Sequence, residues 1–154
     1  MQRYLYGSLS DLYDSHLLKD ADKGAEIIKE KIETGKKIRI ISDYDVDGVS
    51  SNYILYQGLK RSGADVDYKI PDRVEDGYGI NEHLIEKAEE DGIDTIITCD
   101  NGIAAAEQIA YGNSLGLTLI VTDHHDIPFQ RQEDGSISYN LLGPALKRED
   151  SESE

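Results

Sequence analysis

The 154-residue sequence contains little cysteine and no long apolar run. Cys99 is the single cysteine, which excludes an internal disulfide and fits a reducing compartment, so we expect a cytoplasmic protein. No apolar run approaches the roughly 20 residues that cross a bilayer, and no signal-peptide pattern follows Met1. We therefore expect no association with a membrane.

Basic residues are also scarce, because 31 acids face only 16 lysines and arginines and the net charge is −15. A protein that binds a nucleic-acid backbone with its own surface usually presents a basic patch. The charge balance therefore indicates that any phosphate chemistry proceeds through a metal ion, with a basic groove supplied elsewhere.

The length allows one domain with a proper core. Apolar runs of strand length alternate with segments of helical periodicity. The expected strands are 38–43, 66–70, 95–99 and 117–122, and the expected helices are 20–35, 48–62, 81–92 and 104–115. This alternation predicts an α/β fold, an open and mainly parallel sheet with helices on both faces.

Both ends of the chain depart from this pattern. Residues 1–18 have weak periodicity and are expected to form an N-terminal arm, which leaves 19–140 as the domain. A turn signal near Gly135 predicts a hairpin between Phe129 and Tyr139. Residues 141–154 end in an acidic stretch without apolar side chains and are expected to be disordered.

Three of the expected strands end in side chains that bind metals. These side chains are Asp43, Asp45 and Asp47 after the first strand, Asp100 at the end of the third, and Asp123, His124 and His125 after the fourth. In open parallel sheets, ligands bind beyond the carboxyl ends of the strands. Carboxylates and imidazoles without thiolates suit Mn²⁺ or Mg²⁺. A pair of metal ions would need a bridging carboxylate, for which Asp100 is the natural candidate.

Each motif alone has a simpler explanation. The segment from Asp43 to Gly48 resembles the start of a calcium-binding EF-hand loop, but Ile54 stands where that loop needs a bidentate glutamate. Aspartates often cap helices, and the segment 100–102 reads as a common turn. A signalling receiver domain would share the acidic pocket, but would leave His124 and His125 unexplained. The combination at three strand ends favours a metal site.

The turn-rich segment 71–79 follows the second strand and should emerge on the same side as the acids. Arg73 is a candidate phosphate ligand and Tyr78 a candidate base-stacking residue. The alternative is a glycine-hinged connection with no such role.

The motifs Asp43–Gly48, Asp100–Gly102 and Asp123–His125, in this order, resemble the DHH phosphoesterase superfamily and, within it, the RecJ single-strand-specific exonucleases. The resemblance spans roughly residues 4–140. It implies a two-metal site for Mn²⁺ or Mg²⁺ and a catalytic role for His125, oriented by Asp123. The metal ligands that it implies are Asp43, Asp45, Asp47, Asp100, His124 and His125.

The resemblance also implies 5′–3′ digestion of single-stranded DNA in DNA repair and recombination. The family carries a fourth motif and a second domain that lie beyond the region where this chain stops. We therefore expect an incomplete domain that binds Mn²⁺ and hydrolyses DNA weakly or not at all without a complementing C-terminal domain. Contact with DNA would come largely from those further parts.

Two other functions stay open. One is a phosphodiesterase acting on oligoribonucleotides or cyclic dinucleotides, although such relatives often carry a histidine where this chain has Ile41. The other is a non-catalytic regulatory fragment.

Overall fold

The structure is a computed structural model that describes residues 5–74, 76–132 and 134–139. The chain forms two compact units, residues 1–30 and 31–154. The first unit contains two short 3-10 turns, Leu9–Asp11 and Ser15–Leu17, and most of helix α2 (Ala21–Glu33). The Asp14 side chain caps the second turn by accepting a hydrogen bond from the His16 amide. The tail predicted at 141–154 lies outside the described residues.

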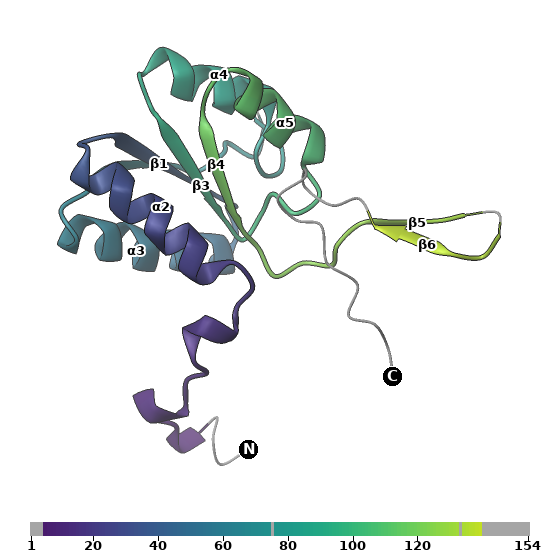
Figure 1. The fold of residues 1–154 in the computed structure, drawn as a ribbon, viewed down its shortest axis with the longest axis horizontal. Coiled ribbons are helices and arrows are strands. Elements are labelled where there is room, and N and C mark those ends of the chain that lie inside the picture. The colour runs from purple at the N-terminus through teal and green to yellow at the C-terminus, as the bar shows by residue number, and fades with distance from the viewer. Residues whose placement is uncertain (1–4, 75, 133, 140–154) are drawn as a thin grey trace. The chain divides into compact units, whose positions relative to one another are not determined.

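The second unit is built on a parallel four-stranded sheet (Figure 1). Its strands are β1 (Lys37–Ser42), β2 (Asp65–Lys69), β3 (Thr95–Cys99) and β4 (Thr118–Thr122), in the order β2-β1-β3-β4. The four predicted strands are confirmed to within one residue at each end. The chain leaves β1 toward β2 and leaves β3 toward β4, so the connections diverge between β1 and β3. Such a divergence creates a crevice at the carboxyl ends of the two strands.

Helices cover both faces of this sheet, which confirms the predicted fold class. Helix α3 (Val46–Arg61) packs on β1 and β2, and its Leu59 is buried. Helices α4 (Glu82–Glu90) and α5 (Ala106–Ser114) contact each other on the opposite face. There, Leu84, Ile85 and Ile109 pack with Ile41 and Ile96 in a buried apolar cluster. The fully buried strand β3 lies at the centre of the sheet.

Local signals explain where the helices begin. The Asn81 side chain accepts a hydrogen bond from the Leu84 amide at 2.9 Å and caps α4, as predicted. The Asp45 side chain caps α3 in the same way through the Gly48 amide, so that helix begins at Val46 rather than at the predicted Gly48. Helix α5 begins at Ala106, two residues later than predicted, because the segment before it adopts turn conformations.

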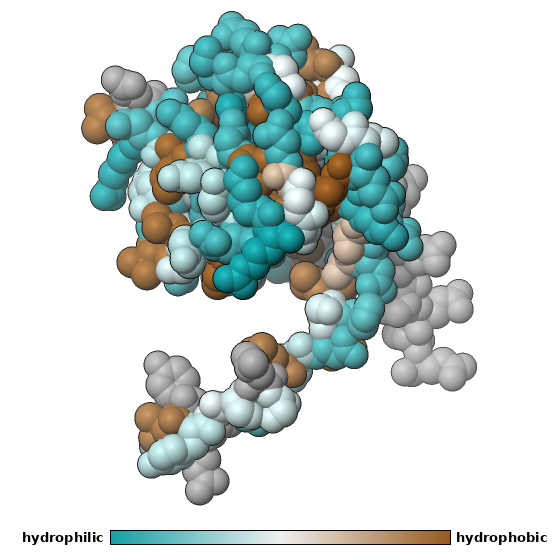
Figure 2. Space-filling view, turned by 90° about the vertical axis from the view of Figure 1, so that its left-hand side faces the viewer, coloured by the Kyte–Doolittle hydropathy of each residue, from teal (hydrophilic) through white to brown (hydrophobic). Residues whose placement is uncertain are grey.

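The last described segment is an antiparallel hairpin of β5 (Phe129–Arg131) and β6 (Ile137–Tyr139), in which Phe129 faces Tyr139. This hairpin was predicted. Among the described residues, no helix combines the length and the apolar character that crossing a membrane requires. The face shown in Figure 2 is mostly hydrophilic, with hydrophobic residues in scattered groups, as the high content of charged residues predicts.

Candidate metal centre

Asp43 follows β1 directly and is 1% exposed. Among the described residues, neither of its carboxylate oxygens has a hydrogen-bond partner. A buried carboxylate without partners is costly, and most buried polar groups in proteins are therefore paired. A bound cation would remove this cost, so the environment of Asp43 fits a metal ligand.

Asp100 follows β3 and adopts a left-handed backbone conformation with φ of 61°, which is uncommon outside glycine. Its Oδ1 lies 2.8 Å from Nε2 of His124. Its Oδ2 is buried and has no hydrogen-bond partner in the described part of the chain. Burial and the negative charge of Asp45 raise the pKa of Asp100, even though His124 opposes this shift. A left-handed backbone at a residue other than glycine and a carboxyl group with a shifted pKa are both typical of functional sites.

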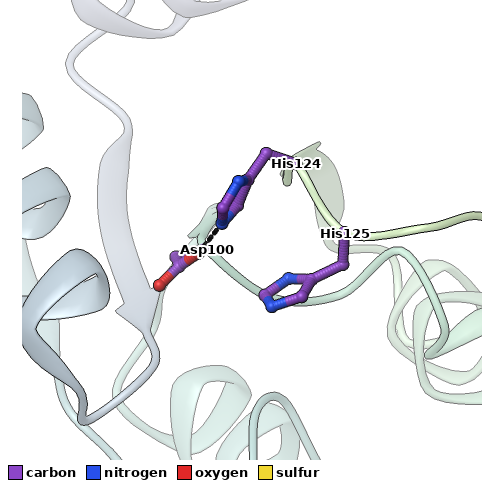
Figure 3. Close-up of side chains that lie close together, drawn as sticks. All are labelled: Asp100, His124 and His125. Atoms are coloured by element: carbon purple, nitrogen blue, oxygen red, sulfur yellow. Dashed lines mark ion pairs between the residues drawn. The ribbon is translucent and has the colours of Figure 1, made fainter.

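Two groups of potential metal ligands share Asp100. One is Asp43, Asp45 and Asp100, and the other is Asp100, His124 and His125; within each group, the candidate ligand atoms lie within 4.8 Å of one another. Figure 3 shows the second group, with His124 and His125 extending from the segment after β4 toward Asp100. Because Asp100 belongs to both groups, it lies where a carboxylate that bridges two metal ions is expected.

Asp45 and Asp47 differ in their positions. Asp45 caps α3, and the hydrogen bond from the Gly48 amide holds the pKa of the Asp45 carboxyl below its ordinary value. Asp47 is exposed in the first turn of α3 and belongs to neither ligand group. An acid at this position stabilises the helix dipole, which gives Asp47 a role without a metal.

Asp123 belongs to neither ligand group and instead orders the loops around them. Its Oδ2 accepts a hydrogen bond from the Ile103 amide, and its Oδ1 accepts three, from the amides of His124 and His125 and from Nδ1 of His125 at 2.6 Å. Burial opposes ionisation of Asp123, but these donors outweigh it and lower the pKa of its carboxyl.

The same contact determines how His125 is oriented. Its hydrogen bond to Asp123 raises the pKa of the His125 imidazole. Because Nδ1 donates to Asp123, Nε2 is the ring nitrogen that remains for a metal or a substrate. This geometry suits an orienting role for Asp123.

Asn101 is a site residue that the sequence analysis does not identify. Its side chain is buried; Nδ2 donates to the carbonyl oxygens of Ile41 at 3.1 Å and Cys99 at 3.0 Å, and Oδ1 accepts from the Ile80 amide. One side chain thus joins β1, β3 and the loop before α4. In the sequence, Asn101 is equally well explained as part of a common turn. Its function is seen only in the structure, where its side chain lies between the ends of β1 and β3.

The loop after β2 approaches the acids, as expected. The Arg73 guanidinium lies 5.3 Å from the centre of the Tyr44 ring, and the Tyr78 ring meets the same ring edge to face, with 6.0 Å between centres. Burial raises the pKa of Tyr78, and the nearby carboxylates of Asp43 and Asp100 raise it further. Tyr44 therefore connects the two candidate substrate residues with the aspartate motif, a function that its sequence position does not indicate.

Known proteins are similar to this chain in sequence and fold. Residues 37–146 match the DHH family, N-terminal domain. The single-stranded-DNA-specific exonuclease RecJ of Bacillus subtilis is 41% identical over 123 residues, which are 80% of this chain and 16% of that protein. RecJ of Thermus thermophilus is 37% identical over 132 residues, 84% of this chain and 19% of that protein.

Solved structures agree with this match. A crystal structure of exonuclease RecJ bound to manganese superposes with a TM-score of 0.66 and 37% identity, covering 71% of this chain and 28% of that one. RecJ from Thermus thermophilus in complex with Mn²⁺ gives a TM-score of 0.61 and 31% identity, covering 75% and 16%. The chain spans about a fifth of the length of the curated relatives that it matches. It belongs to the DHH family, and the part that it matches is that family's N-terminal domain.

Proposed function

We propose that this chain is the metal-binding part of a RecJ-type nuclease that hydrolyses phosphodiester bonds in single-stranded DNA from the 5′ end. The observation that carries the proposal is the pair of ligand groups that share Asp100, with unpartnered carboxylate oxygens on Asp43 and Asp100. The names of the similar proteins, single-stranded-DNA-specific exonucleases, support the substrate.

Asp43, Asp45, Asp100, His124 and His125 would hold Mn²⁺ or Mg²⁺. The donor set of carboxylates and imidazoles fits these ions. Two similar RecJ crystal structures contain manganese, which supports Mn²⁺ at this site. When bound, such ions lower the pKa of a water molecule and stabilise the charge that develops on phosphate.

The protein's own groups prepare the site for this chemistry. Asp123 holds a proton on Nδ1 of His125 and fixes Nε2 as the atom directed to metal or phosphate. Asn101 keeps the ends of β1 and β3 at a fixed separation, so that Asp43 and Asp100 converge. Catalysis by preorganised groups depends on such fixed geometry, because small displacements of a ligand weaken its contribution.

Arg73 and Tyr78 would contact the substrate beside the metals. In the part of the chain that is described, no carboxylate forms an ion pair with Arg73, so its guanidinium is available to a phosphate. Tyr78 is 60% exposed and offers a ring face on which a base can stack.

The test is a nuclease assay with Mn²⁺ on a single strand that carries a label at either end. We expect slow release of mononucleotides from the 5′ end by the chain alone, and none by Asp100→Asn. Digestion from the 3′ end, or digestion that persists in Asp100→Asn, would contradict the proposal. If the chain hydrolyses a cyclic dinucleotide faster than it hydrolyses DNA, the cyclic dinucleotide replaces DNA as the proposed substrate.

A further inference from the structure

The carboxylate of Asp43 is held in place by the main chain that carries it. Its side chain is 1% exposed, and within the described part of the chain neither carboxylate oxygen has a hydrogen-bond partner. Before a metal ion binds, the position of this carboxylate therefore depends on the main chain around Asp43. Strand β1 precedes that main chain and helix α3 follows it.

Helix α3 lies directly against the main chain of Asp43. A Cβ atom at Gly48 would come within 2.4 Å of the Asp43 carbonyl oxygen, so this close approach requires glycine. Asn52 follows Gly48 by four residues and lies one turn further along the same face of the helix. The three buried residues of α3 are Gly48, Asn52 and Leu59, and Asn52 alone among them has a polar side chain.

The Asn52 side chain contacts the last residue of β1. Its Nδ2 donates a hydrogen bond to Oγ of Ser42 at 2.9 Å, and Ser42 directly precedes Asp43. Ser42 is 0% exposed and Asn52 is 4% exposed. Because Ile41 packs in the apolar cluster with α4 and α5, the next side chain, that of Ser42, faces α3. The hydrogen bond thus joins α3 to β1 at the residue before the candidate metal ligand.

The same turn of α3 also reaches β3. Cys99 pairs with Ser42 in the sheet and directly precedes Asp100. Burial raises the pKa of the Cys99 thiol, and the hydroxyl of Ser51, the neighbour of Asn52, opposes this shift. Consecutive residues of α3 therefore lie beside the final residues of the two strands that are followed by metal-binding aspartates.

We propose that Asn52 is a positioning residue of the metal centre and fixes the place of Asp43 through Ser42. This inference rests on the proposed function, because it requires that Asp43 binds Mn²⁺. A buried hydrogen bond between neutral groups adds little net stability, and two apolar side chains of similar size could replace it. Hydrogen bonds constrain distance and angle, whereas apolar contacts have no preferred direction, so the polar pair supplies a fixed geometry.

Metal affinity and stability, measured together on the full chain, separate positioning from packing. The double variant Ser42→Ala with Asn52→Leu leaves neither polar group unpaired, so its thermal unfolding should stay near the wild-type temperature. We expect calorimetric titration to show that it binds Mn²⁺ at least about tenfold more weakly than the wild type, as is typical when groups behind metal ligands are removed. Leu59→Ala is the control at the other end of α3. It should unfold at a lower temperature because it leaves a cavity, yet bind Mn²⁺ as tightly as the wild type.

Two single variants at Ser42 make smaller changes to the same contact. Ser42→Ala removes only the hydroxyl and should also weaken Mn²⁺ binding. Ser42→Thr keeps a hydroxyl for Asn52 and should restore the wild-type affinity. Equal loss in Ser42→Thr and Ser42→Ala would overturn the inference.

The other outcomes distinguish this inference from the proposed function. If the wild type binds Mn²⁺ and the double variant and Ser42→Ala bind it equally well, the pair only fills space and the inference is wrong, while the metal centre stands. If Leu59→Ala loses as much affinity as the double variant, affinity follows stability alone and the inference is again wrong. A wild type that does not bind Mn²⁺ overturns both the inference and the metal centre.

Discussion

Nε2 of His124 lies 2.8 Å from Oδ1 of Asp100, which joins the segment after β4 to the end of β3. A carboxylate oxygen of Asp100 also lies within 4.8 Å of carboxylate oxygens of Asp43 and Asp45, which follow β1. One carboxylate thus contacts the side chains contributed by two different strand ends. The site depends on how the sheet holds these ends together, and this dependence can be tested residue by residue.

Asn101→Asp should destabilise the protein. The Ile41 and Cys99 carbonyls lose their amide donor and face a carboxylate instead. We expect a loss of about 1–3 kcal/mol in the free energy of unfolding, measured by urea denaturation. Asn113→Asp is the control, because Asn113 is exposed. Its free energy of unfolding should change by less than about 0.5 kcal/mol. Equal stability of Asn101→Asp and wild type would show that the buried amide does not hold the strand ends.

Gly48→Ala and Gly58→Ala should have opposite effects, although both lie in α3. A Cβ at Gly48 would overlap the Asp43 main chain, whereas a Cβ at Gly58 would meet no atom. We expect Gly48→Ala to lose about 1–3 kcal/mol in thermal or urea unfolding, because Asp43 must move. Gly58→Ala should gain about 0.5–1 kcal/mol from helix propensity. A neutral Gly48→Ala would mean that α3 does not press on the aspartate loop.

Asp123→Asn should change the titration of His125. The hydrogen bond to Asp123 raises the pKa of His125 above its ordinary value of 6.5. In metal-free protein, this pair therefore contributes stability that is complete below pH 6.5 and is lost as the pH rises through the folded-state pKa. We expect NMR titration to place the wild-type imidazole above 6.5 and the Asp123→Asn imidazole nearer to it. Identical titration curves would contradict the role of Asp123.

Much of the fold was predictable because its signals are local. The apolar runs predict β1 to β4, and Asn81 marks the start of α4. Ligands of open parallel sheets bind beyond the carboxyl ends of the strands. Applied to the predicted strands, this rule also indicated that Asp43, Asp100 and His124 lie near one another. These inferences need only periodicity, caps and the direction of parallel strands.

The contacts that refine the site depend on tertiary structure, which sequence spacing does not encode. Asn101 joins three elements that are distant in the chain, and Tyr44 meets Arg73 and Tyr78 from another loop. The position of Asp47 is a further example, since Asp45 and Asp47 look equivalent in sequence. Only the start of α3 at Val46 separates the cap from an exposed helical residue.

Calorimetric titration with Mn²⁺ tests most directly whether Asp100 is the centre of a metal site. We predict that the wild type binds Mn²⁺ and that Asp100→Ala loses at least about tenfold in affinity. Asp47→Asn, which lies outside both ligand groups, should lose much less. Equal binding of Mn²⁺ by the wild type and Asp100→Ala would contradict the assignment of these residues as a metal centre.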